Sequence, residues 1–147
     1  MTNINERRMA AHANRRVGRD GGPLLYDLLG GEVPLRRIVE TFYDIVEHEP
    51  EGHRLHRLHK LGHGVAHSRE EQFNFLSGFL GGPSLYAQKY GHTNIRDMHA
   101  HVDIDAAVKD DWLECMTIAL GRCGIAPEVQ KKLMSHLTTV ATMLVNR

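Results

Sequence analysis

Histidines are the residues of this sequence whose type and spacing most readily suggest chemistry. The chain has 147 residues and 11 histidines, and six of the histidines lie between positions 48 and 67. Imidazoles four residues apart on one helix face can share a transition metal. One hypothesis is therefore a histidine-rich metal-binding module, built on a series spaced by three or four residues: His53, His56, His59, His63 and His67.

Two features of the same stretch argue against a metal site. Gly62 and Gly64 flank His63 and would interrupt the single helix that must align the series. Cysteines are absent from the stretch, carboxylates are few, and positive charge that repels cations is added by Arg54, Arg57 and Lys60. We therefore favour a solvated loop whose imidazoles face water.

Single residues elsewhere in the chain could also carry chemistry. His99 and His101 follow a short segment, and a histidine near a helix end is commonly structural or a surface cation. Trp112, the only tryptophan, would ordinarily belong to the core. Tyr43 follows Phe42 just off an apolar stripe, and a buried tyrosine needs a partner for its hydroxyl, either a backbone carbonyl or a bound molecule. The sequence has no G-x-S-x-G, P-loop or H-E-x-x-H motif, so no catalytic nucleophile is predicted.

The elements that must position these residues are predicted to be helices. Apolar residues recur at helical spacing from near Pro34 to before Pro50, from Val108 to Ala119, and from Pro127 to Leu144. No segment alternates with a period of two, and glycine clusters and prolines mark the breaks. The pattern therefore predicts an all-α fold.

A fourth helix, from about His67 to Leu80, has two neighbouring stripes. One stripe is an ordinary core face made of Phe73, Leu76 and Leu80. The other is polar at its start and aromatic at its end, and consists of Ser68, Gln72, Phe75 and Phe79. An amide at the edge of an apolar interior is unfavourable unless it finds a partner. Either Gln72 has such a partner, or Ser68 and Gln72 simply face water.

Composition excludes several classes of protein. Eighteen basic and 18 acidic residues balance, which argues against a nucleic-acid-binding surface. No apolar run is long enough to span a membrane, and the two cysteines, Cys115 and Cys123, suit a reducing cytoplasm. Residues 1–23 are basic and lack a helical period, so we expect a flexible N-terminal extension followed by one domain over residues 24–147.

In their order along the chain, these motifs resemble the truncated haemoglobins, and the position of Trp112 points to the second group of that family. The resemblance covers residues 24 to the C-terminus. It rests on Leu25-Tyr26-Asp27-Leu28-Leu29-Gly30-Gly31, Phe42-Tyr43, Phe75 to Pro83 with Tyr86, Gly91-His92, Arg96 and His99, and Trp112-Leu113 with Cys115-Met116.

The resemblance implies a two-over-two helical sandwich that encloses one haem b per chain. His99 matches the proximal iron ligand. A distal hydrogen-bonding cage is implied for Tyr43, Gln72 and Trp112, with Ser68 at the pocket mouth and His59, or alternatively His56, at a further distal position. Contacts with the haem are implied for Phe75, Phe79, Tyr86 and Trp112, and a contact with a haem propionate for Arg96.

The sequence departs from the family pattern around the predicted iron ligand. Thr93, Asp97-Met98, His101 and Val102 replace the usual residues, so the alternative register, with His101 as the iron ligand, stays open. Gln72 replaces the commoner leucine, and this change adds a hydrogen-bond donor to the expected cage.

The expected function is therefore binding of O2, CO, NO or peroxide by a haem protein, with the ligand retained by distal donors. Such retention suits scavenging, sensing or redox chemistry better than bulk oxygen transport. The alternative is a haem-dependent enzyme, peroxidase-like or NO-dioxygenase-like, served by an unidentified reductase. A haem-free histidine-rich metal-binding module is a remote alternative. The resemblance is compatible with a homodimer, and we expect no nucleic-acid or membrane partner.

Overall fold

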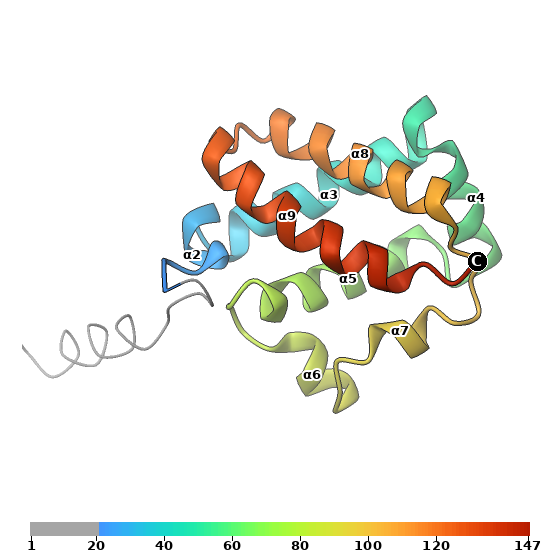
Figure 1. Ribbon diagram of the computed structural model, residues 1–147, viewed down its shortest axis with the longest axis horizontal. Coiled ribbons are helices and arrows are strands. Elements are labelled where there is room, and N and C mark those ends of the chain that lie inside the picture. Colours follow the sequence, from blue (N-terminus) through green and yellow to red (C-terminus); the bar gives the residue numbers. More distant parts are fainter. Residues whose placement is uncertain (1–20) are drawn as a thin grey trace, which may run out of the picture.

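The computed structural model describes residues 21–147, and its helices lie within that range (Figure 1). The expectation of a flexible extension over residues 1–23 falls almost entirely outside the described residues. In chain order the helices are α2 (Leu25–Leu29), α3 (Glu32–His48), the 3-10 turn η1 (Pro50–Gly52), α4 (His53–Leu61), α5 (Val65–Phe79), α6 (Leu85–Tyr90), α7 (Ile95–Met98), α8 (Ala106–Arg122) and α9 (Pro127–Leu144).

The four predicted helices and the all-α fold are confirmed. Helix α3 begins two residues before Pro34, so the proline sits in the first turn, where its missing N–H breaks no intrahelical bond. Helix α9 opens on Pro127, as the sequence predicts. Helix α5 begins at Val65, directly after Gly64, whose φ of 89° allows the turn that separates it from α4.

The histidine-rich stretch differs from the expected solvated loop. Residues 53–61 form α4, and the predicted break at the glycines around His63 is confirmed. Helix α4 is held by Leu55, which is only 3% exposed, and by the turn η1 beneath it. A Cβ on Gly52 would lie 2.3 Å from the Cα of Val46, so a glycine is required for η1 to lie against the end of α3. These contacts with distant parts of the chain stabilise a helix that its local composition does not suggest.

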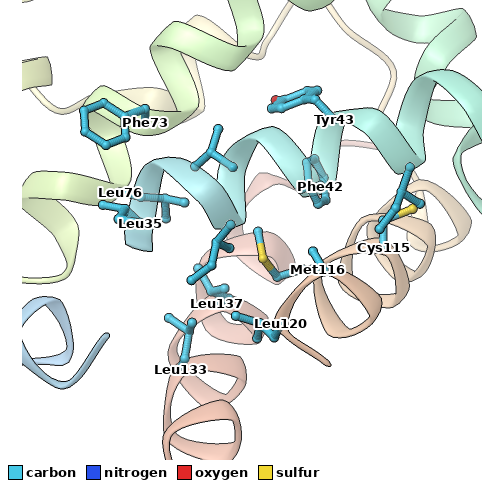
Figure 2. Close-up of a cluster of buried hydrophobic side chains, with 14 of the residues drawn as sticks. Leu35, Phe42, Tyr43, Phe73, Leu76, Cys115, Met116, Leu120, Leu133 and Leu137 are labelled. Atoms are coloured by element: carbon cyan, nitrogen blue, oxygen red, sulfur yellow. The ribbon is translucent and has the colours of Figure 1, made fainter. Parts of the chain in front are cut away.

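The long helices form a two-over-two sandwich. Helix α3 packs against both α5 and α8, and α8 packs against α9 (Figure 1). The core between them is made of apolar side chains from all four of these helices. Figure 2 shows Leu35 and Phe42 of α3 with Met116 and Leu120 of α8 and Leu133 and Leu137 of α9, all of them at most 2% exposed.

The short helices α6 and α7 lie along the edge of the sandwich formed by α5 and α9 (Figure 1). These helices belong to the segment that follows the glycine-rich end of α5, and His99 comes directly after α7. Among the described residues, no helix combines the length and the apolar character needed to cross a bilayer.

Candidate functional site

A cavity of about 680 Å³ lies among α3, α4, α5, α7, α8 and α9. This volume is within the range of pockets that hold cofactors and other small molecules. Much of the wall is apolar, with contributions from Leu58, Leu76, Ile104, Val108, Leu137 and Leu144. The cavity is therefore a low-dielectric environment in which charged groups are disfavoured.

Most of the predicted site residues meet in this one cavity. Its wall includes Tyr43, His59, Ser68, Gln72, Phe75, Tyr86, His99 and Trp112, which come from α3 to α8. Two predicted residues are not part of the wall. Phe79 stacks on Phe75 from behind, with ring centroids 5.4 Å apart and an angle of 18°. Arg96 is exposed on α7 and is not part of the wall, so its contact with a haem propionate stays a prediction.

His99 stands at the end of α7, and its ring has a fixed orientation. Its Nδ1 lies 2.6 Å from the carbonyl oxygen of Ile95, one turn earlier. Because a carbonyl only accepts, Nδ1 carries the proton and Nε2 keeps its lone pair. This is the tautomer that a metal ion requires of a neutral imidazole, and the hydrogen bond is the kind that orients metal-binding histidines.

The segment around His99 is tied to the C-terminal end of the chain. The side chain of Asn146 accepts a hydrogen bond from the Ile104 N–H at 2.9 Å and donates one to the Val102 carbonyl at 2.9 Å. At the other end of the segment, the Asn94 side chain caps α7 by accepting from the Asp97 N–H. These contacts hold the register of a segment that departs from the family pattern. His101 also lies on the cavity wall, but the hydrogen bond that orients His99 is not formed by its ring.

His59 repeats the arrangement of His99 on another helix. Its Nδ1 lies 2.6 Å from the carbonyl oxygen of Leu55, and its ring meets the Tyr43 ring edge-on at 5.6 Å. Burial lowers the pKa of His59 below its ordinary value, although the hydrogen bond to Leu55 opposes this effect. His59 is therefore neutral at pH 7. The alternative distal residue, His56, is not part of the cavity wall.

Tyr43 is 3% exposed and projects into the cavity from α3. Phe42 and Tyr43 leave the helix in different directions, so that Phe42 lies in the core while Tyr43 reaches the cavity (Figure 2). The Phe42 ring backs both Tyr43, at 4.9 Å, and Trp112, at 5.2 Å. Burial raises the pKa of the Tyr43 phenol, and the Arg69 guanidinium partly offsets this effect. Tyr43 is thus a neutral hydrogen-bond donor at every physiological pH.

Several polar groups of the wall lack hydrogen-bond partners among the described residues. Three donors among them are the Tyr43 hydroxyl, the Gln72 amide and the Trp112 indole N–H. Polar groups that face an apolar space are unfavourable unless a partner is supplied. A bound molecule with a hydrogen-bond acceptor would supply it. Together with the free Nε2 of His99, this donor set fits a haem whose small ligand is held by hydrogen bonds.

Arg69 is a residue of the site that the sequence interpretation missed. From α5 it binds three carboxylates of α3, Glu40 at 2.5 Å, Asp44 at 2.8 Å and Glu47 at 2.6 Å. Its guanidinium also lies 5.8 Å from the Tyr43 ring. The signal in the sequence is the spacing of the three acids, which puts them on one face of α3 and makes that face attractive to a cation.

The remaining histidines of the cavity lie at exposed positions. His63, His67 and His101 are neighbours, with ring centroids 5.1 Å apart for the first pair and 6.2 Å for His63 and His101. Within residues 21–147, no three histidine, cysteine or acidic side chains are arranged to hold a metal ion. The structure therefore gives the hypothesis of a histidine-rich metal-binding module no support.

Comparison with known proteins identifies the family. The model of the bacterial-like globin family matches residues 24–146. The group 2 truncated hemoglobin YjbI of Bacillus subtilis (strain 168) is 32% identical over 124 residues, which are 83% of this chain and 88% of the relative.

Two solved structures have the same fold. A cold-adapted truncated hemoglobin from Pseudoalteromonas haloplanktis TAC125 aligns with a TM-score of 0.77 and 32% identity, over 84% of this chain and 98% of that one. The truncated oxygen-avid haemoglobin from Bacillus subtilis aligns with a TM-score of 0.74 and 31% identity, over 84% of this chain and 99% of that one. The cavity and its donor set lie within the matched region. The chain therefore belongs to the bacterial-like globins and, among them, to the group 2 truncated haemoglobins.

Proposed function

We propose that the cavity holds one haem b per chain and that the protein binds O2 and related small ligands there, including CO, NO and peroxide. The observation that supports this proposal most strongly is that one apolar cavity contains both an oriented imidazole and three donors without partners in the described part of the chain. Membership of the globin family implies haem binding and small gaseous ligands. The similar truncated haemoglobin from Bacillus subtilis is oxygen-avid, which points in the same direction.

Each residue of the cavity has a separate task in this proposal. Nε2 of His99 would bind the iron, because the hydrogen bond from Nδ1 to the Ile95 carbonyl leaves the lone pair on Nε2. The rings of Phe75 and Tyr86 pack against the macrocycle, and they already pack against each other at 6.0 Å. A bound haem supplies an open iron position at which diatomic molecules bind.

Retention of the ligand depends on the three donors. The Tyr43 hydroxyl, the Gln72 amide and the Trp112 indole come from three different helices and donate to whatever acceptor occupies the cavity. Each hydrogen bond contributes on the order of 1 kcal/mol, and more if the acceptor carries charge. Two or three such bonds slow ligand escape about 10- to 1000-fold. Ser68, whose hydroxyl donates to the Gly64 carbonyl at 3.1 Å, lies beside Gln72 at the start of α5.

We also propose that the protein works in the cytoplasm. Cys115 and Cys123 are both free thiols, and a pair of unpaired cysteines suits a reducing compartment.

The experiment that tests this function combines spectroscopy with one substitution. The purified chain should show the absorption bands of a haem protein, and its ferrous form should respond to CO and to air. His99→Gly should lose its haem during purification and should regain it when imidazole is added. His101→Gly is the matched control, because it removes an imidazole from the same wall and should keep its haem. Loss of haem from His101→Gly alone would move the iron ligand by two residues, and a chain without haem would overturn the proposal.

A further inference from the structure

His59 and His99 form the same hydrogen bond in the same cavity. In each residue Nδ1 lies 2.6 Å from the carbonyl oxygen four residues earlier, Leu55 for His59 and Ile95 for His99. Both rings line the cavity wall. The two residues come from different helices, α4 and the end of α7, so the likeness does not result from a shared local segment.

This hydrogen bond decides what His59 can offer to the cavity. Because Nδ1–H is used on a carbonyl oxygen, Nε2 has a lone pair and no proton. A neutral His59 is therefore a Lewis base on its cavity side and cannot donate a hydrogen bond there. In this respect it differs from Tyr43, Gln72 and Trp112 and matches His99.

The environment of His59 keeps it in that form. The backbone of α4 is held in place by Leu55, which is buried in the core. Burial is the largest cause of the lowered pKa of His59, and the nearby His56 and His99 lower it further.

We propose that His59 is a second protein ligand of the haem iron and occupies the coordination position opposite His99 when no gas is bound. The inference rests on the proposed function, since it requires a haem in the cavity. The lone pair of Nε2 forms a dative bond to iron. No proton or electron moves, because Nδ1–H remains bonded to the Leu55 carbonyl.

Other side chains of the wall are poorer candidates for this position. The Tyr43 phenol stays protonated because its pKa is raised by burial. His63, His67 and His101 are exposed and are not oriented by a hydrogen bond to a carbonyl of their own segment. Apart from His99, His59 is the half-buried imidazole of the wall whose Nδ1 is bonded to a carbonyl and whose Nε2 has a free lone pair.

An internal ligand makes gas binding a competition. A gas molecule can reach the iron only after the His59 side chain leaves. His59 lies near the C-terminal end of α4, which Gly62 and Gly64 follow. The observed rate of gas binding is then limited by the departure of His59 at high gas concentration.

The test compares the haem-loaded full-length chain with two variants of α4. His59→Gln removes the imidazole but keeps a polar side chain of similar length. His56→Gln is the matched control, because His56 lies on the same helix but not on the cavity wall. Absorption and electron paramagnetic resonance spectra, recorded without gas, report whether the iron has one or two imidazole ligands.

We expect low-spin, six-coordinate spectra for the unsubstituted chain and for His56→Gln, and high-spin spectra for His59→Gln. In stopped-flow mixing with CO, the observed rate of CO binding should level off at high CO concentration in the unsubstituted chain and in His56→Gln. In His59→Gln the rate should instead rise in proportion to CO.

A third measurement uses the haem-free chain. The 15N chemical shifts of its histidine rings should show Nδ1 protonated and Nε2 unprotonated in His59. A proton on Nε2 would contradict the inference.

The outcomes separate this inference from the function on which it rests. A chain that takes up no haem overturns both. A haem-loaded chain with high-spin iron overturns only the role of His59. Low-spin spectra that persist in His59→Gln would show that a different side chain is the second ligand and would also overturn it.

Discussion

At the scale of single residues, the position of one proton separates the two kinds of polar group in the cavity. His99 and His59 each use Nδ1–H on a carbonyl of their own segment and present a lone pair to the cavity. Tyr43, by contrast, presents an O–H that has no partner within residues 21–147. The cavity therefore contains Lewis bases for a metal and donors for a ligand, and each residue type can be tested separately.

The Tyr43 hydroxyl can be removed with little change in packing. Tyr43→Phe keeps the ring that packs on Phe42, so only the donor is lost. A donor that contributes about 1–3 kcal/mol predicts O2 dissociation roughly 5- to 150-fold faster in stopped-flow measurements. Dissociation of CO should change much less, because bound CO is a weak hydrogen-bond acceptor. Tyr26→Phe, which alters a tyrosine outside the cavity wall, is the control. Equal acceleration of both gases would mean that Tyr43 controls access instead.

The raised pKa of Tyr43 predicts how this retention depends on pH. An ordinary phenol loses its proton near pH 10, and it would then stop donating. Burial disfavours the phenolate and raises the pKa of Tyr43, so the donor form persists above that pH. We therefore expect the O2 dissociation rate to show no rise as the pH passes from 9 to 10. A rise that is present in the unsubstituted chain and absent from Tyr43→Phe would contradict this expectation.

At the scale of the elements, α3 and α5 are joined by charge as well as by apolar packing. Arg69 lies at the centre of this contact, with its side chain 18% exposed and three carboxylates of α3 around it. Surface ion pairs contribute little, but a partly buried guanidinium that serves several carboxylates contributes more. The contact lies beside Tyr43 and sets the separation of two helices that provide donors to the cavity.

Removal of the guanidinium should loosen this contact. Arg69→Met keeps the aliphatic part of the side chain, and we expect the free energy of unfolding, measured by urea denaturation, to fall by about 1–2 kcal/mol. Arg147→Met is the control, because the ion pair of Arg147 with Asp103 is exposed at 68% and 73%. Loss of this exposed ion pair should change the free energy of unfolding by less than about 1 kcal/mol. Equal effects in the two variants would mean that the Arg69 contacts act as ordinary surface ion pairs.

Gly52 controls the contact between η1 and the end of α3. A methyl group at this position would lie 2.6 Å from the Ile45 carbonyl oxygen and 2.7 Å from that of Val46, and backbone atoms cannot move aside cheaply. We expect Gly52→Ala to lower the free energy of unfolding by more than about 2 kcal/mol.

Gly121 in α8 provides the matched comparison for that substitution. A Cβ at Gly121 meets nothing within 4 Å. Gly121→Ala should leave stability unchanged or raise it by up to about 1 kcal/mol, since alanine favours the helix. If both substitutions had the same effect in urea denaturation, the close approach at Gly52 would not be a real constraint.

At the scale of the whole molecule, a cavity of about 680 Å³ lies beside the core that joins the two layers. Its wall includes side chains from both layers and from α4, α6 and α7. A space of this size leaves many apolar atoms without neighbours, so a molecule that fills it should stabilise the entire fold.

Removal of the haem should therefore lower the stability of the whole fold. A ligand present at a thousand times its Kd stabilises the folded state by about 4 kcal/mol, which corresponds to a rise in Tm on the order of 10 °C. We expect the haem-loaded chain to melt at this higher temperature in circular dichroism scans. Iron-free protoporphyrin is the control, because it fills the cavity without a bond to His99, and it should give an intermediate Tm. Equal Tm values with and without haem would contradict a haem site in the cavity.

Much of the architecture could be predicted from local patterns. The recurrence of apolar residues at helical spacing predicts α3, α5, α8 and α9, because each of these helices buries one face and the period of that face is a property of the chain itself. Pro127 and Gly64 mark helix boundaries for equally local reasons. The ordered motifs that contain Tyr43, Trp112 and His99 also sufficed to recognise the family.

Local sequence patterns did not predict that the stretch around His59 is helical, nor all of the residues that form the cavity wall. The helical state of α4 depends on the burial of Leu55 and on the close contact of Gly52 with α3. Neither contact can be inferred from the polar composition of α4. Arg96 matched a motif but lies outside the cavity wall.

The sequence by itself determined the fold class, the long helices and the family, because those depend on periodicities and motifs along the chain. Only the tertiary structure decided which side chains meet. Tyr43 and Trp112 are 69 positions apart and share a wall only once α3 and α8 are packed together. The meeting of Arg69 with the acids of α3 and the choice of Nε2 as the free nitrogen of His59 likewise depend on distances in space, which no local pattern contains.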